Sequence, residues 1–255
     1  MYLFKMNKIL DIEISFDRKE IIDTIDRYIN HHHKGYIVTI NSNIMVNAYK
    51  NDDYKSILNN SSFNICDGSV LATALNIING TKYNSYPGPD FFMDRIKEKK
   101  YKHAFLGSTK EVLNGLKTPL AQVDECLSDS LFIELPFLNV NDYDYYTIGN
   151  VIQENAPDFI WVSLGAPKQE EFSALLIKHI TKGLIVPVGA AFEFYSNNSK
   201  VGRSPGILRK FRLEWFFRLY KQPLKTFKRL KNEFFYMPII LFKEIVKSKY
   251  ENTVN

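Results

Sequence analysis

The stretch Asp158-Phe-Ile-Trp-Val-Ser-Leu-Gly-Ala-Pro-Lys-Gln-Glu-Glu171 decides the fold class of this 255-residue chain. Its apolar run 159–164 predicts a buried strand, and a Gly-Ala-Pro corner separates that strand from a helical pattern opening with Lys168, Gln169 and Glu170. Ligands of α/β proteins bind where strands end and helices begin, because free backbone N–H groups face outward there. The polar cluster therefore suits a sugar or phosphate ligand, and an ordinary turn with solvated side chains explains it equally well.

The same order of strand and helix extends along most of the chain. Strands are predicted at 12–16, 36–40, 63–66, 102–106, 159–164 and 184–188, and helices at 19–30, 45–50, 53–59, 69–78, 91–99, 110–116, 143–155 and 168–179. Asp90 is the expected N-cap of the helix that starts at Phe91. Because strands alternate with helices, the predicted fold class is α/β, a Rossmann-like parallel sheet flanked by helices. We expect this body to span residues 1–202, followed by a basic, aromatic-rich helical C-terminal appendage at 203–255.

The composition is that of a globular protein, with 45% hydrophobic and 24% charged residues. The first residues lack the apolar core of a signal peptide, and no apolar stretch reaches the roughly 18 residues of a membrane span. The two cysteines, Cys66 and Cys126, provide neither a disulfide framework nor zinc-ligand spacing. We therefore expect a cytoplasmic protein without a metal site.

Charge is distributed unevenly. The segment from Arg203 to Tyr250 holds 13 Lys and Arg but only three Asp and Glu, a local net charge of +10 beside −5 for the remainder. Aromatic residues interleave with these cations, which is typical of a helix on an anionic membrane surface. Nucleic acid is the rival partner, because its phosphates attract the same side chains, and packing of the aromatic residues onto the body is a third interpretation. The apolar run from Phe234 to Phe242 favours lipid.

Five predicted strands end in glycine or small polar residues, at 39–41, 67–68, 107–109, 165–170 and 189–193. Such residues let a phosphate or sugar approach the backbone. None of these turns carries a dinucleotide or P-loop glycine pattern, which disfavours a dehydrogenase. Asp67 is the candidate catalytic residue, because a carboxylate at a strand end can remove a proton from a hydroxyl nucleophile. Its alternative role is to cap the helix that follows.

The motifs also occur in a characteristic order over about residues 36 to 230. They are Thr39-x-Asn41, Asp67-Gly68, Phe105-Leu-Gly107, Gly165-Ala-Pro-Lys-Gln-Glu170, Val188-Gly-Ala-Ala-Phe192, Arg203-Ser-Pro205 and Leu213-Glu-Trp-Phe-Phe-Arg218. This series resembles the WecG/TagA/CpsF family of glycosyltransferases. The resemblance implies inverting transfer of N-acetylmannosamine, or a related hexose or uronic acid, from a UDP-sugar, with no obligatory metal or other cofactor. The implied acceptor is a polyprenyl-diphosphate-linked saccharide of teichoic acid, capsule or other cell-surface polysaccharide synthesis, at the inner face of the cell membrane.

The resemblance further implies roles for individual residues. Asp67 would be the catalytic base, and Arg218 would face the diphosphate, where a guanidinium stabilises the charge of the leaving UDP. The expected substrate contacts are Thr39, Asn41, Gly165, Lys168, Gln169 and Glu193. The expected membrane or diphosphate contacts are Arg203, Arg212, Trp215, Lys221, Lys228 and Arg229. A non-catalytic membrane-binding module of the same fold is the alternative function, and a homo-oligomer is left open.

Two departures from the family pattern concern the expected donor pocket. Ser85 stands where the family often has an arginine, and Phe192-Glu193 replaces the more usual Phe-Asp pair. The resemblance therefore leaves the identity of the donor sugar open, whereas the candidate base Asp67 is unaffected.

Overall fold

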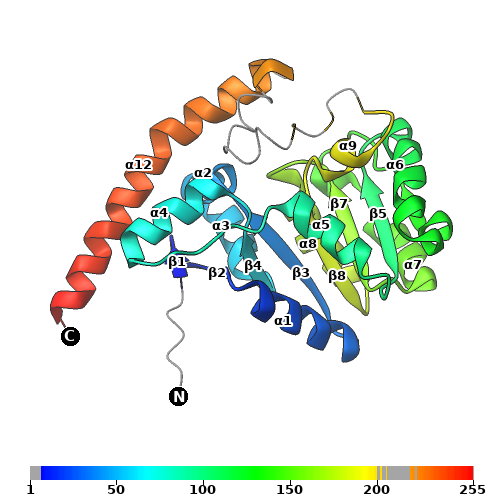
Figure 1. Ribbon diagram of the computed structural model, residues 1–255, viewed down its shortest axis with the longest axis horizontal. Coiled ribbons are helices and arrows are strands. Elements are labelled where there is room, and N and C mark those ends of the chain that lie inside the picture. The colour runs from blue at the N-terminus through cyan, green and yellow to red at the C-terminus, as the bar shows by residue number, and fades with distance from the viewer. Residues whose placement is uncertain (1–6, 200–201, 203–204, 206–218, 222, 255) are drawn as a thin grey trace.

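The computed structural model describes residues 7–199, 202, 205, 219–221 and 223–254 (Figure 1). Its main sheet has six parallel strands in the order β4-β3-β8-β7-β5-β6. The strands are β3 (Lys34–Ile40), β4 (Phe63–Cys66), β5 (His103–Gly107), β6 (Leu131–Ile133), β7 (Phe159–Ser163) and β8 (Gly183–Pro187). The predicted α/β class is confirmed, and β6 is a strand that the sequence did not predict.

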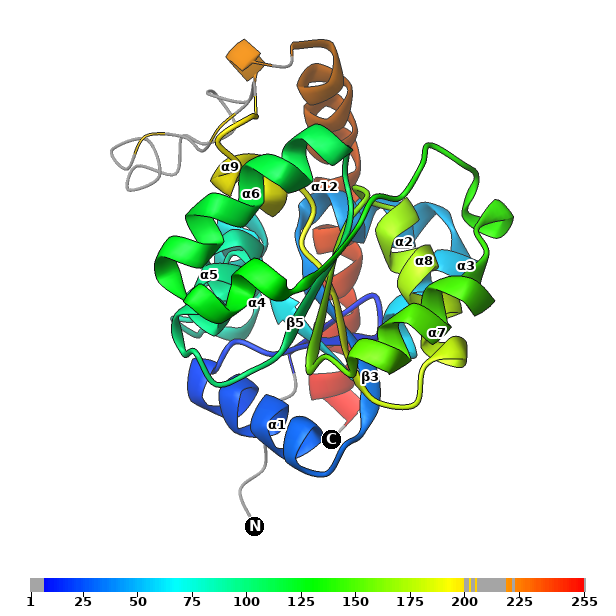
Figure 2. The ribbon, with the colours of Figure 1, turned by 90° about the vertical axis from the view of Figure 1, so that its right-hand side faces the viewer.

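Helices cover both faces of this sheet. They are α1 (Arg18–Asn30), α2 (Ser42–Lys50), α3 (Asp52–Asn59), α4 (Ser69–Asn79), α5 (Gly88–Lys97), α6 (Lys110–Val123), α7 (Tyr145–Asn155), α8 (Lys168–Leu176), α9 (Ala191–Tyr195) and α12 (Pro223–Val254), with short 3-10 turns η1 (Glu125–Asp129), η2 (Val140–Asp142) and η3 (Ile177–His179). Figure 2 shows α1, α5, α6 and α9 on one face, and α2, α3, α7 and α8 on the other. The architecture is therefore the expected Rossmann-like one.

Alternation along the strands divides the core between the two faces. In β7, Phe159 and Trp161 belong to the cluster under α1, α5 and α6, whereas Ile160 and Val162 belong to the cluster under α2, α3 and α8. All four side chains are fully buried. Strands covered on both faces read as continuous apolar runs, which is why this segment could be recognised from its sequence.

A two-stranded hairpin, β1 (Asn7–Ile9) and β2 (Ile12–Ile14), lies beside the outer strand β4. Ser15 continues the hairpin into a parallel bridge, donating its N–H to Asn64 O at 2.8 Å and accepting the N–H of Cys66 at 3.2 Å. The hairpin thereby covers part of a sheet edge that would otherwise present unpaired backbone groups. The sequence predicted a strand at 12–16 but not β1.

Two of the predicted helix boundaries that were wrong have an identifiable cause. Helix α5 begins at Gly88 with Pro87 at the cap position and no side-chain cap bond, so Asp90 is a first-turn residue and not the N-cap. Helix α6 continues past Pro119 to Val123 instead of ending near Leu116. Proline has no N–H for the carbonyl four residues earlier. That carbonyl, of Gly115, accepts the N–H of Asn197 at 3.0 Å instead, which lets the helix continue.

The last helix, α12, packs along α2 at one side of the molecule (Figure 1). Its Met237 and Ile240 are buried in the same core cluster as α2, and Lys243 Nζ donates to the hydroxyl of Tyr49 at 2.9 Å. Near its end, Glu244 accepts the N–H of Leu10 at 3.0 Å. The appendage expected at 203–255 thus contributes, through its described part, to the core of the body. Among the residues described, no helix is both long and apolar enough to cross a membrane.

Candidate active site

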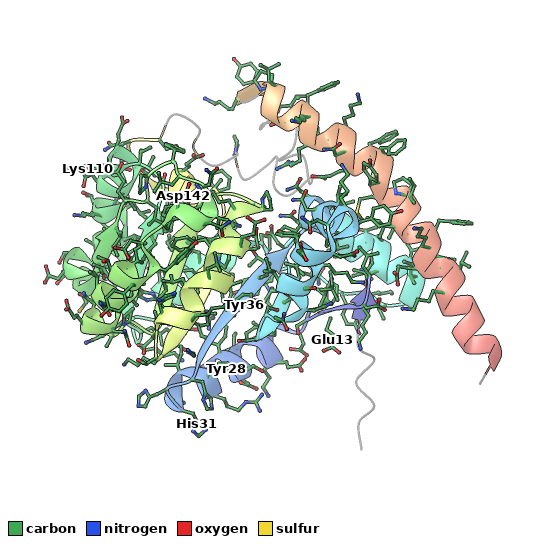
Figure 3. The ribbon with its side chains drawn as sticks, turned by 180° about the vertical axis from the view of Figure 1, so that it is seen from behind. Glu13, Tyr28, His31, Tyr36, Lys110 and Asp142 are labelled. Atoms are coloured by element: carbon green, nitrogen blue, oxygen red, sulfur yellow. The ribbon has the colours of Figure 1, made fainter. Side chains whose placement is uncertain are left out.

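The two ends of the sheet differ in chemistry. In Figure 3, Lys110 and Asp142, which follow β5 and β6, lie toward the carboxyl end of the strands, whereas Tyr28 and His31, which precede β3, lie toward the amino end. A surface cavity of about 500 Å³ at the amino end is lined by Tyr28, His32, His33, Lys34 and Thr181, and none of the predicted site residues is among them. The predicted site residues lie instead at the carboxyl end of the strands, and the candidate site is at that end.

Asp67 follows the last residue of β4, and both of its carboxylate oxygens accept hydrogen bonds. The backbone N–H of Gly88 donates to Oδ1 at 2.7 Å, and the side-chain amide of Asn41 donates to Oδ2 at 3.0 Å. The N-cap of α4 is Gly68, without any side-chain cap bond, so the capping role considered for Asp67 is wrong. The carboxylate is held at the sheet edge by two neutral donors, and each oxygen keeps a lone pair for a further proton.

Asn41 uses the two ends of its amide for different purposes. Its Oδ1 accepts the N–H groups of Asn43 and Ile44, at 3.1 and 3.3 Å, and so caps α2. Its Nδ2 is thereby turned toward Asp67. Capping the helix and orienting the candidate base are one arrangement, because an amide whose oxygen faces the helix must present its nitrogen elsewhere.

Thr39 joins two strands beneath this carboxylate. Its hydroxyl donates to Pro187 O at 3.2 Å, which links the ends of β3 and β8, and its side chain is 5% exposed. A Cβ at Gly88 would lie 3.1 Å from Thr39 Oγ1, so the glycine lets the turn before α5 approach β3 closely. The same Gly88 provides the N–H that holds Asp67.

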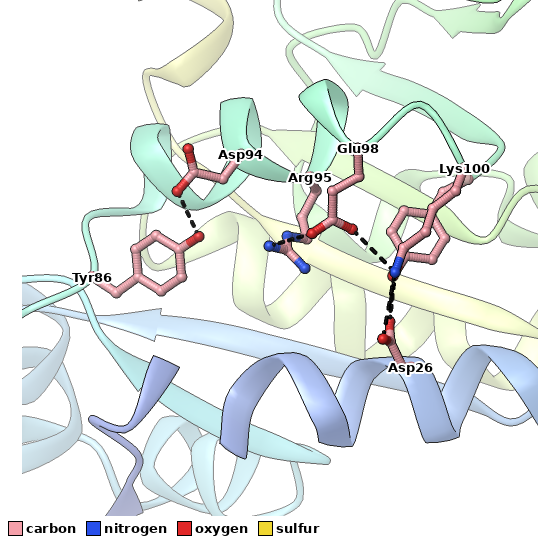
Figure 4. Close-up of polar contacts among 7 residues, drawn as sticks. Asp26, Tyr86, Asp94, Arg95, Glu98 and Lys100 are labelled. Carbon is pink, nitrogen blue, oxygen red and sulfur yellow. Dashed lines mark hydrogen bonds and ion pairs between the residues drawn. The ribbon is translucent and has the colours of Figure 1, made fainter. Parts of the chain in front are cut away.

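Polar contacts near the C-terminal half of α5 hold this helix beside α1 (Figure 4). Arg95 Nη2 pairs with Glu98 Oε1 at 2.7 Å, and Lys100 Nζ lies 3.4 Å from Asp26 Oδ1 on α1. Tyr86, just before the helix, donates its hydroxyl to Asp94 at 2.8 Å. Of these contacts, the one between Lys100 and Asp26 links the segment after α5 to α1, and the one between Tyr86 and Asp94 links α5 to the segment before it.

Gln169, the predicted cleft glutamine, is 4% exposed and holds two strand ends together. Its Oε1 accepts the N–H of Gly165, after β7, and the N–H of Gly189, after β8, both at 3.1 Å. Its Nε2 donates to Glu170 Oε1 at 2.7 Å. All polar atoms of this side chain are thus engaged within the protein, and the hydrogen bonds fix two glycine turns at the carboxyl end of the sheet.

Glu170 is fully buried, and its other oxygen accepts the hydroxyl of Tyr54 at 3.0 Å. Burial raises the pKa of Glu170 to about 7, against the opposing effect of the hydrogen bonds from Gln169 and Tyr54. Burial and the neighbouring Glu170 carboxylate also raise the pKa of Tyr54, so this hydroxyl stays protonated and donates. A carboxylate that titrates near neutrality therefore lies directly behind the Gln169 bridge.

The other predicted substrate contacts lie around these turns. Gly165 adopts φ +78°, with open space at its Cβ position and a cis Ala166–Pro167 bond after it. The ammonium of Lys168 donates to the carbonyl of Leu138 and lies 4.9 Å from the ring centre of Tyr143. Glu193 is half-buried in α9. The structure therefore groups Thr39, Asn41 and Asp67 around Gly88. It groups Gly165 and Gln169 at the ends of β7 and β8. The two groups meet at β8, where Pro187 accepts the hydroxyl of Thr39.

The predicted membrane and diphosphate residues fall on the last part of the chain. Arg203, Arg212, Trp215 and Arg218 lie outside the described residues. Lys221 and Lys228 are exposed, and Arg229 Nε pairs with Glu233 Oε1 at 3.2 Å. Their predicted roles stay predictions.

Three residues of the site were not singled out from the sequence. Gly88 contacts Asp67, which is 21 positions away in the sequence, and Tyr54 contacts Glu170, which is 116 positions away. No local sequence pattern predicts contacts at such separations. Ser163, whose hydroxyl donates to Gly189 O at 2.6 Å, could have been found as a polar residue ending an apolar strand.

No group of three or more His, Cys, Asp or Glu placed to hold a metal ion occurs in the part of the chain that is described. Cys66, next to Asp67, is buried, and burial together with the Asp67 charge raises the pKa of its thiol to about 12. The thiol therefore stays protonated near neutral pH and is not an activated nucleophile.

Ligands of parallel α/β sheets bind beyond the carboxyl ends of the strands, and an oriented carboxylate at that place can accept a proton from a hydroxyl group. The sequence profile described as glycosyl transferase WecG/TagA/CpsF family matches residues 7–251. The chain therefore belongs to this glycosyltransferase family, as its motifs predicted.

Similar proteins carry the name N-acetylglucosaminyldiphosphoundecaprenol N-acetyl-beta-D-mannosaminyltransferase. That of Bacillus subtilis (strain 168) is 28% identical over 212 residues, covering 79% of this chain and 78% of its own. That of Bacillus spizizenii is 26% identical, covering 78% and 76%. That of Staphylococcus aureus (strain MW2) is 27% identical over 220 residues, covering 84% and 80%.

Proposed function

We propose that this glycosyltransferase moves N-acetylmannosamine, or a related sugar, from a UDP-sugar to a saccharide linked to polyprenyl diphosphate, with inversion. The acceptor class and the sugar follow the names of the similar proteins, which specify an N-acetylmannosaminyl group and N-acetylglucosaminyldiphosphoundecaprenol. The UDP carrier follows from the family resemblance of the motifs. The pathway class is the assembly of a cell-surface polysaccharide such as teichoic acid.

The observation that carries the proposal is the oriented carboxylate of Asp67. As the acceptor hydroxyl attacks the anomeric carbon, its proton passes to Asp67, the new glycosidic bond forms, and the bond to the UDP oxygen breaks with its electron pair. Gly88 and Asn41 hold the carboxylate without neutralising it, because both donate neutral N–H groups. Developing charge on UDP needs a cation, and Arg218 remains our candidate for it.

The remaining predicted substrate contacts divide into two groups in this proposal. Gly165 and Glu193 border the donor pocket, whereas Lys168 and Gln169 support it from behind, since their polar atoms already contact Leu138, Gly165 and Gly189. Asn41, half-buried beside Asp67, contacts the acceptor sugar. Thr39, which is 5% exposed and donates to Pro187 O, supports this side of the site from behind. No obligatory metal enters the proposal.

We place the enzyme peripherally on the inner face of the cell membrane. The support is the outward side of α12, where Leu224, Phe227, Phe234, Phe235 and Phe242 are each more than 60% exposed. Exposed Lys228 and Lys231 lie on the same side by helical periodicity. Apolar side chains flanked by lysines suit an anionic leaflet, where each cation contributes about 1 kcal/mol.

The test measures transfer from UDP-N-acetylmannosamine to a short-chain polyprenyl-diphosphate N-acetylglucosamine, for wild type, Asp67→Asn and the exposed-acid control Asp53→Asn. We expect Asp67→Asn to lose at least about 100-fold in kcat and the control to match wild type. Thermal stabilisation by UDP checks that each variant is folded and binds. Asparagine can accept from only one of the two N–H donors that face Asp67, so the substitution can disturb the local structure. The loss of kcat therefore counts as evidence for the base only if the variant still binds UDP.

Two outcomes would overturn the proposal. Full turnover by Asp67→Asn would remove the assigned base. Wild type that binds anionic vesicles, yet shows neither UDP stabilisation nor transfer from any UDP-sugar, would favour the non-catalytic membrane-binding module.

A further inference from the structure

The bridge formed by Gln169 depends on which way its amide is turned. Only the oxygen end can accept the N–H groups of Gly165 and Gly189, and only the nitrogen end can donate to Glu170. With the amide reversed, its NH2 would face two backbone N–H groups, and no hydrogen bond would form on that side. The two glycine turns are therefore held only when the amide has this one orientation.

Glu170 and Tyr54 enforce that orientation from behind. Glu170 Oε1 is 2.7 Å from Gln169 Nε2, and in the ionised form of Glu170 it can only accept and so rejects the oxygen end of the amide. Tyr54, on α3, donates to Glu170 Oε2 at 3.0 Å and keeps the carboxyl group in place. Exposures of 2% for Tyr54, 0% for Glu170 and 4% for Gln169 leave little room for water to replace any of these bonds.

The bridge also adjoins the residues around Asp67. Gly189 receives a second hydrogen bond, from Ser163 to its carbonyl oxygen, so β7 and β8 are fastened at their ends from two directions. Two residues earlier, Pro187 accepts the hydroxyl of Thr39, which would lie 3.1 Å from a Cβ at Gly88. A rotation of the Gly189 turn would therefore change the positions of Gly165 after β7 and of Thr39 on β3.

We infer that Tyr54 and Glu170 are positioning residues for sugar transfer: by fixing the amide of Gln169, they hold the Gly165 and Gly189 turns in the shape that the nucleotide-sugar donor requires. This inference rests on the function proposed above for the same site. Neither residue touches the substrate. Their effect is on the geometry of backbone that does, where displacements near 1 Å lower rates by about 100-fold.

The test compares four variants of the full chain. Glu170→Met removes both acceptors at similar length, Tyr54→Phe removes one hydroxyl, and Glu170→Gln is the conservative replacement. A glutamine can still present its oxygen to Gln169 Nε2 while its own NH2 donates to the Tyr54 hydroxyl. Tyr36→Phe is the matched control, because Tyr36 is also a buried tyrosine of the same cluster whose hydroxyl donates to a carbonyl, Ile57 O at 2.5 Å.

We expect Glu170→Met to raise the KM for the donor and lower kcat at least tenfold, and Tyr54→Phe to show a smaller loss of the same kind. Glu170→Gln should stay within about threefold of wild type. The amide resonances of Gly165 and Gly189, followed by NMR and hydrogen exchange without substrate, should move in Glu170→Met and stay in Glu170→Gln. A purely structural role would lower Tm in Glu170→Met and Tyr36→Phe alike and leave both glycine amides unmoved.

Unchanged glycine amides and kinetics in Tyr54→Phe would overturn the inference, and this single-atom change serves even if Glu170→Met does not fold. Failure of the proposed function is separable, because it would show as a wild type without transfer. In that case the glycine amides still report whether Tyr54 and Glu170 fix the bridge.

Discussion

At the scale of single residues, Asn41 does two jobs that can be separated by mutation. Its Oδ1 caps α2, and its Nδ2 orients the carboxylate of Asp67. Serine retains a capping oxygen but is too short to carry an amide to Asp67, whereas alanine loses both functions. The pair of variants therefore distinguishes a defect of folding from a defect of chemistry.

We expect Asn41→Ala to unfold at about 1 kcal/mol lower stability than Asn41→Ser in urea titrations, because only serine caps the helix. Both variants should lose kcat to the same extent, about tenfold or more, since both leave Asp67 held by Gly88 alone. Wild-type kcat in Asn41→Ser would contradict the orienting role. A rise in the KM for the acceptor, with kcat unchanged, would leave Asn41 its contact with the acceptor and remove its orienting role.

At the scale of elements, α12 has two faces of different chemistry. One face packs on α2 through Met237 and Ile240, and Lys50 lies 4.0 Å from the ring centre of Tyr236. The opposite face leaves Phe234 86% and Phe242 68% exposed. Core packing and membrane contact, weighed as alternatives from the sequence, thus concern different residues of one helix, so the packing face does not exclude the membrane role proposed for the outward face.

Replacement of Phe234, Phe235 and Phe242 by Gln should weaken binding to phosphatidylglycerol-containing vesicles at least tenfold, because the apolar side chains that enter the interface are lost. Tyr146→Gln, which removes a 70% exposed aromatic ring from α7, is the control and should bind like wild type. Sedimentation with vesicles at two salt concentrations measures both effects. Equal binding by the triple variant and wild type would remove α12 as the membrane contact.

Elements also differ in how well the sequence predicted them. The four strands β3, β5, β7 and β8 are buried on both faces and were recognised as apolar runs, whereas β6 has three half-buried residues and no comparable signal. Motifs located Asp67, Thr39 and Gln169 at the strand ends. The sequence could not reveal that Gln169 faces inward, since that follows from Glu170 and from a tyrosine on another helix.

At the scale of the whole molecule, two buried groups make stability depend on pH in opposite directions. Burial raises the pKa of Glu170 to about 7, so the stability it contributes is present below its unfolded pKa of 4.5 and is lost as pH rises through 7. Burial lowers the pKa of His103 from 6.5 to about 4, so its contribution is present above 6.5 and is lost as pH falls toward 4. Between pH 4.5 and 6.5, a rise in pH therefore lowers the free energy of unfolding through Glu170 and raises it through His103.

Replacement of either Glu170 or His103 should therefore leave a pH dependence of stability that is set by the other group. Relative to wild type, Glu170→Gln should gain stability as pH rises from 5 to 8, and His103→Asn should gain stability as pH falls from 7 to 5, each by on the order of 2 kcal/mol. Asparagine is chosen because, in the wild type, Trp161 Nε1 donates to His103 Nδ1, and the amide oxygen of asparagine provides a replacement acceptor. Urea unfolding at each pH measures the differences, and parallel pH profiles for all three proteins would contradict both assignments.

The contacts between the first hairpin and the last helix join residues more than 230 positions apart: Leu10 with Glu244, and Asp11 with Lys247. A ribosome makes the hairpin early and its partners late. At about 5–20 residues per second, residues 228–247 of α12 take about 1–4 s to be made, whereas a helix forms in about a microsecond. The newly made chain must therefore wait, with the apolar surface of α2 uncovered, for a closure timed by translation, and during that wait the surface is open to chaperones and to lipid.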